Sequence, residues 1–196
     1  MIENNFDGGS FPSYSYDLNL DYGAASQDIR HSFSLYSSFQ LPFKIRISPS
    51  VSISSGRPFN ITSGADTNRD SIFNDRPTFA QLSATCKKLG LTNNFCDISG
   101  VTNPEKTIVP RNYGRGPGFF NLNLNLNRTF TFRKNEKARA YNLVFGVQAN
   151  NLLNHTNRNA PISNLSSNRF GQVFSTMNSF GGTANRRIDL QVRFNF

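Results

Sequence analysis

The sequence FNLNLNLNRTFTF, residues 120–132, alternates apolar and polar side chains almost without a break. Leucine and phenylalanine fill one set of positions, and asparagine fills the other as far as residue 127. Successive side chains of a β-strand point to opposite faces, so this pattern predicts a strand with one apolar and one polar face. Arg128 interrupts the apolar set, which indicates that it lies near a membrane or core boundary.

The same alternation recurs in four further segments. The predicted strands span about 31–43, 45–54, 119–132, 140–150 and 187–196. Pro49 falls on the apolar face of the second, and proline is tolerated in a strand mainly at an edge or a bulge. No stretch of ten or more residues combines clear helical periodicity with good helix formers, and the composition favours strands and turns over helices.

The connections between these strands alternate between short and long. The first two strands join tightly around Phe43–Lys44, and RKNEKAR (133–139) forms a short charged turn between the third and fourth. Two long polar segments, 56–117 and 152–185, make the other connections, and GRGPG (114–118) is interpreted as a flexible hinge. A compact soluble domain rarely carries such long loops.

Transmembrane β-barrels alternate short periplasmic turns with longer extracellular loops. The predicted fold class is therefore all-β: an antiparallel up-and-down transmembrane β-barrel, partial, with about five C-terminal strands and two long extracellular loops. With the short turns in the periplasm, the C-terminus is also periplasmic. Aromatic residues at the strand ends favour contact with outer-membrane lipid; they are Phe43, Phe119, Phe132, Tyr141 and Phe196.

The chain is basic, with a formal net charge of +9. Its lysines and arginines are scattered, whereas nucleic-acid binders usually cluster them, so we expect no nucleic-acid partner. Anionic headgroups or an acidic solute are better partners for this charge. No apolar run reaches the length of a membrane helix. The first residues, MIENNFDGGS, do not resemble a signal peptide, and we expect the chain to be the tail of a longer protein.

Cys86 and Cys96 are the two cysteines. No second cysteine pair and no nearby histidine would complete a zinc site, so a disulfide in an oxidising compartment is favoured, with two unrelated thiols as the alternative. The chain has two histidines, His31 and His155, and neither lies in a pattern with a nucleophile and an orienting carboxylate. We therefore expect no enzymatic activity.

The segment DTNRDSIFND (66–75) contains oxygen-bearing side chains at calcium-ligand spacing. The candidate ligands are Asp66, Asn68, Asp70, Asn74 and Asp75. The first three match the first, third and fifth positions of an EF-type loop. However, Ser71 replaces the usual glycine and Pro77 the usual glutamate. The segment predicts either a calcium site or a turn rich in aspartate and asparagine, and no other cofactor is expected.

Five segments together resemble a known family. They are DYGAASQDIRHSFSLYSSFQLPF (21–43), SSGRPFNITSGADTNRDSIFNDRP (54–77), GRGPGFFNLNLNLNRTF (114–130), ANNLLNHTN (149–157) and RRIDLQVRFNF (186–196). They resemble the C-terminal part of TonB-dependent outer-membrane receptors, especially the Oar-like group with carboxypeptidase-regulatory-like N-terminal domains. The resemblance implies a barrel of about 22 strands, an N-terminal plug and a TonB box. Neither the plug nor the box is found in this chain.

The C-terminal strand resembles the sorting signal that the barrel-assembly machinery reads. The matching residues are Leu190, Val192, Phe194 and Phe196. An amphipathic edge strand can pair with another sheet. The alternative is an ordinary edge strand.

Three functions follow from these observations. The leading hypothesis is a fragment of a TonB-dependent receptor in the outer membrane of a Gram-negative bacterium, which takes up a large, unidentified solute and contacts TonB through the plug. The first alternative is an outer-membrane adhesion or surface-binding barrel that uses the two long loops. The second is a soluble β-domain that binds carbohydrate or another anionic ligand.

Overall fold

The computed structural model of the chain describes residues 2–3, 11–133, 140–177 and 184–196. The chain divides into two compact units. The sheet unit comprises His31–Ser54, Phe119–Asn157 and Thr176–Phe196, and the loop unit comprises Met1–Arg30, Ser55–Gly118 and Arg158–Ser175. Most of the predicted charged turn, residues 134–139, lies outside the described residues.

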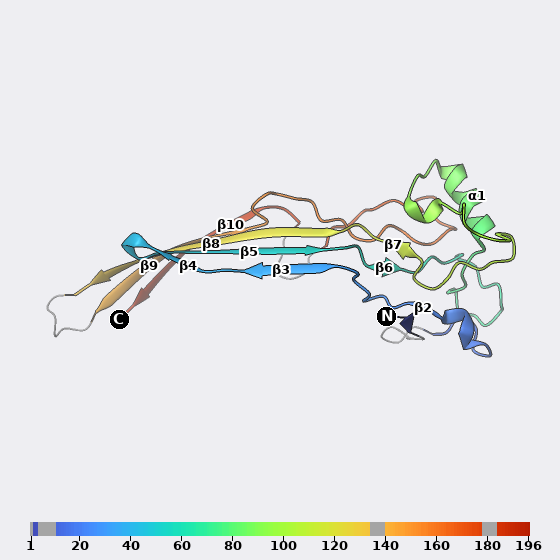
Figure 1. Cartoon of the computed structure of the whole chain (residues 1–196), viewed down its shortest axis with the longest axis horizontal. Helices are drawn as coiled ribbons and strands as arrows, with labels where there is room; N and C mark the ends of the chain where they lie inside the picture. Colours follow the sequence, from blue (N-terminus) through green and yellow to red (C-terminus); the bar gives the residue numbers. More distant parts are fainter. Residues whose placement is uncertain (1, 4–10, 134–139, 178–183) are drawn as a thin grey trace. The chain divides into compact units, whose positions relative to one another are not determined.

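The sheet unit is one antiparallel sheet (Figure 1). Its strands are β3 (Ser32–Tyr36), β4 (Phe39–Leu41), β5 (Ile45–Ser54), β8 (Phe119–Phe132), β9 (Tyr141–Asn150) and β10 (Arg187–Asn195). The order is β10-β9-β8-β5-β3, and β4 also pairs with β5. β5, β8, β9 and β10 occupy the predicted ranges to within one residue. Among the described residues no strand pairs with the outer edges of β3 and β10, so the sheet does not close.

The prediction of one continuous strand at 31–43 is wrong, because β3 and β4 are separate. Both keep the same register against β5, so the gap between them is not a bulge. Pro49 lies opposite the gap. Its carbonyl oxygen accepts a hydrogen bond from the backbone N–H of Ser37 at 3.1 Å, but proline has no N–H to return the bond. The ladder is therefore interrupted at this point.

A tight hairpin joins β4 to β5, as predicted. Leu41 pairs with Ile45, and a short 3-10 helix, η3 (Pro42–Lys44), spans the turn. Phe43 and Lys44 have φ angles of 62° and 56°. Residues other than glycine adopt this left-handed region uncommonly, and here it reverses the chain within three residues.

The loop unit contains an α-helix of 11 residues, although the sequence indicated no helical stretch of ten or more residues. α1 spans Phe79–Leu89. The Thr78 hydroxyl accepts from the backbone N–H of Gln81 at 3.3 Å, and the Gln81 side chain accepts from the backbone N–H of Thr78 at 2.9 Å. This reciprocal capping fixes the first turn. Gly90, at φ 63°, ends the helix in the left-handed conformation.

The other elements of the loop unit are short. They are β1 (Ile2–Glu3) paired with β2 (Gly23–Ala24), β6 (Pro58–Phe59) paired with β7 (Gly114–Arg115), η2 (Leu18–Asp21) and η4 (Asn94–Cys96). None of the helices in the described part of the chain is long and apolar enough to cross a membrane.

The segment 114–118, interpreted from sequence as a flexible hinge, is instead closely packed. Gly114 begins β7 and lies against the Phe59 ring, so that a Cβ atom there would overlap the ring. The backbone N–H of Gly116 donates to the carbonyl oxygen of Arg57 at 2.9 Å. Glycine at position 114 therefore permits close approach.

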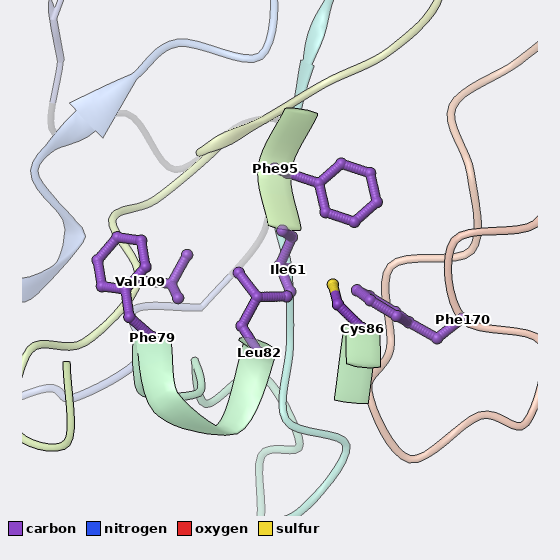
Figure 2. Close-up of a cluster of buried hydrophobic side chains, with 7 residues drawn as sticks. All are labelled: Ile61, Phe79, Leu82, Cys86, Phe95, Val109 and Phe170. Carbon is purple, nitrogen blue, oxygen red and sulfur yellow. The ribbon is translucent and has the colours of Figure 1, made fainter. Parts of the chain in front are cut away.

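Both long loops contribute to the hydrophobic core of the loop unit. The buried cluster consists of Ile61, Phe79, Leu82, Cys86, Phe95, Val109 and Phe170 (Figure 2). The Phe95 ring packs edge to face against Phe59 and Phe170, with centroid distances of 5.8 and 5.7 Å. Phe170 belongs to the second predicted loop and the others to the first, so the two loops fold together.

Cys86 of α1 and Cys96 of η4 form a disulfide, with their Cα atoms 5.9 Å apart. The link ties the C-terminal part of α1 to the segment that carries Phe95. Such a cross-link stabilises a fold mainly by restricting the unfolded chain. It therefore holds two parts of the core together.

Candidate functional site

In the described part of the sheet unit, the apolar face carries no cluster of buried hydrophobic side chains. Its exposed side chains include Phe33, Leu35, Phe39, Leu41, Ile53, Phe145, Val147, Ile188, Leu190, Val192 and Phe194. Leu190 is 79% exposed, whereas every member of the buried cluster belongs to the loop unit. A soluble sheet buries its apolar face, but a barrel strand turns this face toward lipid. The sheet unit therefore has the surface of a membrane-embedded sheet.

Aromatic rings gather on this face near the hairpin ends of β8 and β9 and the C-terminal end of β10. Phe130 packs edge to face on Phe145 at 5.8 Å between centroids. Phe194 stacks with Tyr141 at 6.1 Å and with Phe196 at 6.0 Å. Aromatic girdles of this kind lie where a barrel meets the membrane interface.

Arg128 lies among these rings on the apolar face. It is opposite Ile45 on one side and Phe145 on the other. Its guanidinium carbon lies 4.5 Å from the centroid of the Phe130 ring. A cation over an aromatic face is stabilised by the ring electrons, and a long arginine side chain can extend toward a polar boundary. Arg128 is thus placed at the aromatic end of the apolar face.

The opposite face carries polar side chains in rows that cross the strands. One row is Ser48, Asn125, Gln148 and Asp189, and the next is Arg46, Asn127, Gly146 and Gln191. The side-chain amide of Asn127 donates to that of Asn125 at 2.7 Å. In a barrel this face lines the interior.

A cleft of about 640 Å³ lies on this polar face. Amide and hydroxyl side chains of β4, β8 and β10 line it, together with three cationic side chains, Lys44, Arg46 and Arg193. We call it the basic cleft. Lys44 Nζ donates to Thr131 Oγ1 at 2.8 Å, and Arg46 Nε donates to Gln40 Oε1 at 3.5 Å. Sequence reasoning missed this site, because Arg193 of β10 is far along the chain from Lys44 of η3 and Arg46 of β5, and the three meet only through the strand order.

The predicted assembly residues of β10 lie on its apolar face. Leu190 is opposite Val147, and Val192 is opposite Phe145. Phe194 and Phe196 stack on each other beyond them. The outer edge of β10 is unpaired among the described residues. Recognition of this strand by the assembly machinery stays a prediction.

The carboxylates of the predicted calcium segment accept hydrogen bonds from their own loop. Asp66 accepts from the backbone N–H groups of Asp70 at 3.1 Å and Ser71 at 2.9 Å. Asp70 accepts from the backbone N–H of Ile72 at 2.7 Å and, through its other oxygen, from the Asn68 side chain at 3.1 Å. These contacts are typical of turns built by aspartate and asparagine.

The remaining candidate ligands contact other residues. Asp75 accepts from the Thr67 hydroxyl at 2.6 Å, and the Asn74 side chain donates to the carbonyl oxygen of Phe11 at 2.9 Å. In the described part of the chain, no three acidic, histidine or cysteine side chains converge as a metal site would require. Calcium binding stays a prediction.

The loop unit contains a buried charge cluster that sequence reasoning did not find. Asp21 lies 3.5 Å from Arg76 and 3.9 Å from Arg111, and all three are nearly fully buried. Asp21 also accepts from the backbone N–H of Ser13 at 2.8 Å. Burial lowers the pKa of Arg76, and the charge of Asp21 opposes that shift. These residues lie far apart in the chain, and no local motif links them.

The comparisons with known proteins agree with this geometry. A family model described as "Outer membrane beta barrel domain" matches residues 2–189. No curated protein matches the chain, and no solved structure does.

The family match confirms the predicted fold class of an antiparallel outer-membrane sheet, which is partial here because the sheet is not closed. It also supports a location in the outer membrane. Because this family model covers nearly the whole chain, the chain belongs to the outer membrane beta barrel domain family.

Proposed function

We propose that this chain provides the C-terminal strands and two extracellular loops of a TonB-dependent receptor of the Oar-like group. Such a receptor takes up a large solute across the outer membrane with energy delivered through TonB. The resemblance of five segments to that group supports this role. The observation that carries the proposal is that one chain contains both a sheet with an exposed apolar face, as suits a membrane, and a loop unit with its own hydrophobic core. A receptor needs both a membrane wall and an ordered surface for its solute.

In this proposal the loops at 56–117 and 152–185 face the cell exterior, and the short turns and the C-terminus face the periplasm. The Cys86–Cys96 disulfide is compatible with an oxidising compartment. β10 carries the signal for the barrel-assembly machinery. No enzymatic step is proposed.

Cysteine labelling in intact cells tests the orientation. Ser99 is exposed in the loop unit, and Phe43 is 80% exposed in the hairpin between β4 and β5. A membrane-impermeant maleimide is expected to label Ser99→Cys in intact cells and Phe43→Cys only after the outer membrane is permeabilised. The native cysteines are joined in a disulfide and give little background. The reverse pattern would refute the orientation.

Energy coupling is tested with the protein expressed from its own gene. Folded barrels migrate faster on gels before boiling than after it, and we expect this heat-modifiable mobility. Site-specific crosslinking is then expected to capture TonB in energised cells and to fail in cells without the proton-motive force. A heat-modifiable protein that never crosslinks to TonB would contradict transport.

The adhesion alternative has one observation in its favour. Aromatic side chains of the loop unit are widely exposed, with Tyr16 90%, Phe11 67% and Phe73 67% exposed. Large exposed aromatic groups often mark binding surfaces. A barrel without TonB coupling that attaches cells to a surface would support this alternative. The soluble-domain hypothesis conflicts with the family match and with the uncovered apolar face.

A further inference from the structure

The basic cleft carries positive charge that no described acidic side chain balances. Its cations are Lys44, Arg46 and Arg193, and its described lining contains no aspartate or glutamate. The two contacts of these cations within hydrogen-bond distance are to Thr131 and Gln40, which are neutral. Within the described residues no salt bridge joins any of the three cations to a carboxylate.

The neighbouring acid on the same face is already engaged. Asp189 lies two residues before Gln191 on β10. One of its oxygens contacts Arg187 Nε at 2.9 Å and accepts from the Asn150 side chain at 3.3 Å. Asp189 therefore compensates Arg187 rather than the cations of the cleft.

The cations flank a polar floor. Arg46 lies on β5 and Arg193 on β10, with β8 and β9 between them. At about 4.8 Å between neighbouring strands, β5 and β10 are roughly 14 Å apart. Arg46 and Arg193 line the same cleft as Asn127 and Gln191. A space of about 640 Å³ is suited to a small ligand or part of a larger one.

Gly146 lies beside two of the amide side chains that line the cleft. It stands between Asn127 and Gln191 in one row across the sheet. A Cβ atom at this position would lie 2.6 Å from Oδ1 of Asn127 and 3.5 Å from Cβ of Gln191. The absence of a side chain at Gly146 therefore allows the Asn127 amide to lie over this position.

We propose that the basic cleft binds the oxyanion groups, carboxylate or phosphate, of an acidic solute. This inference rests on the proposed function, because the polar face must line the barrel interior. Guanidinium groups bind carboxylate and phosphate through paired, charge-assisted hydrogen bonds. The lysine adds a third positive charge, and the amide and hydroxyl groups add neutral donors. The cleft thus selects for anionic solutes.

The experiment uses the full-length protein folded in detergent micelles, first checked for heat-modifiable mobility. Calorimetric titrations with tripolyphosphate and citrate measure binding, and maltotriose is the uncharged probe. The test variant is Arg46→Gln with Arg193→Gln. The control is Arg128→Gln, which removes an arginine from the apolar face of the same sheet.

We expect both polyanions to bind and maltotriose to give no heat. Each cation removed from the cleft should weaken binding by about tenfold, as is usual when a charge-assisted hydrogen bond is lost. Arg128→Gln should leave the affinity unchanged, and added salt should weaken binding to the wild type.

Three results would overturn the proposal. The first is equal weakening by the cleft variant and by Arg128→Gln, which would indicate attraction by overall charge. The second is a heat-modifiable wild type that binds neither polyanion. The third is a cleft variant that loses heat-modifiable mobility while Arg128→Gln keeps it, which would assign the cations to packing against another protein segment. A wild type without heat-modifiable mobility would instead refute the barrel on which the proposed function depends.

Discussion

Replacement of Leu82 by alanine should open the loop unit without affecting the sheet. Leu82 is completely buried in the core beside α1 residues Phe79 and Cys86. Leucine-to-alanine changes in protein cores cost about 2.7–5.0 kcal/mol, with more lost where the cavity cannot collapse. Here the capped first turn and the disulfide hold α1 in place. We therefore expect a loss of about 3.5 kcal/mol, which raises the open population a few hundredfold.

Native-state proteolysis measures this opening. Lys87 and Lys88 are exposed trypsin sites near the end of α1, and a protease cuts a helix mainly when the helix opens locally. When opening and closing are fast, the cleavage rate follows the population of the open form. A cut after either lysine falls between Cys86 and Cys96, so the fragments separate on a gel only after reduction.

The matched control is Leu18→Ala. Leu18 also belongs to the loop unit, but it is 44% exposed. Its replacement should change the opening free energy by no more than about 0.5 kcal/mol. The reasoning is refuted if the Leu82 and Leu18 variants are cleaved at the same rate, because the buried cluster would then contribute nothing to the stability of the loop unit.

Three further predictions concern other parts of the chain. Gly56→Ala should destabilise the loop unit in the same proteolysis assay, because the new Cβ would overlap the carbonyl group of Gly116, whereas Gly100→Ala, which has open space around it, should have little effect. Phe196→Ala should reduce the amount of heat-modifiable protein in the outer membrane, and Leu153→Ala, at a residue 61% exposed, should not; equal yields would remove the assembly role of the terminal aromatic. The hydrogen bond from Arg115 lowers the pKa of Asp28 below its ordinary value of 3.8. The stability from this pair is therefore present above pH 3.8 and is lost as the pH falls through the lower pKa of the folded state. Thermal melting curves recorded above and below this pH range should show that Asp28→Asn lacks this pH-dependent part of the stability. A pH dependence equal to that of the wild type would exclude a stabilising role for the pair.

The sheet could be predicted because its signal is local. Apolar and polar residues alternate along each strand, so residues 120–132 indicate both faces without knowledge of the neighbouring strands. The break opposite Pro49 could be predicted in part, because the sequence alone shows that this residue lacks a backbone N–H. Its effect on the pairing of Ser37 required the register.

The loop unit was missed where the signal was weak or non-local. Thr78 and Gln81 match a capping box, and Phe79, Leu82 and Cys86 recur at helical spacing, so a closer reading could have found α1. No sequence rule joins Phe170 to Phe95, because their contact depends on tertiary folding. That Arg46 and Arg193 line the same cleft also follows only from the strand order.

The shared core of the two loops has a consequence for the order of folding. Ile61 precedes β8 and β9 in the chain, whereas Phe170 follows them. The first loop can form its disulfide and α1 early, but it lacks part of its core until the second loop has been made. Contacts between segments so distant in the chain are slow to form. The core of the loop unit is therefore completed late, only after the chain has been synthesised through β8 and β9.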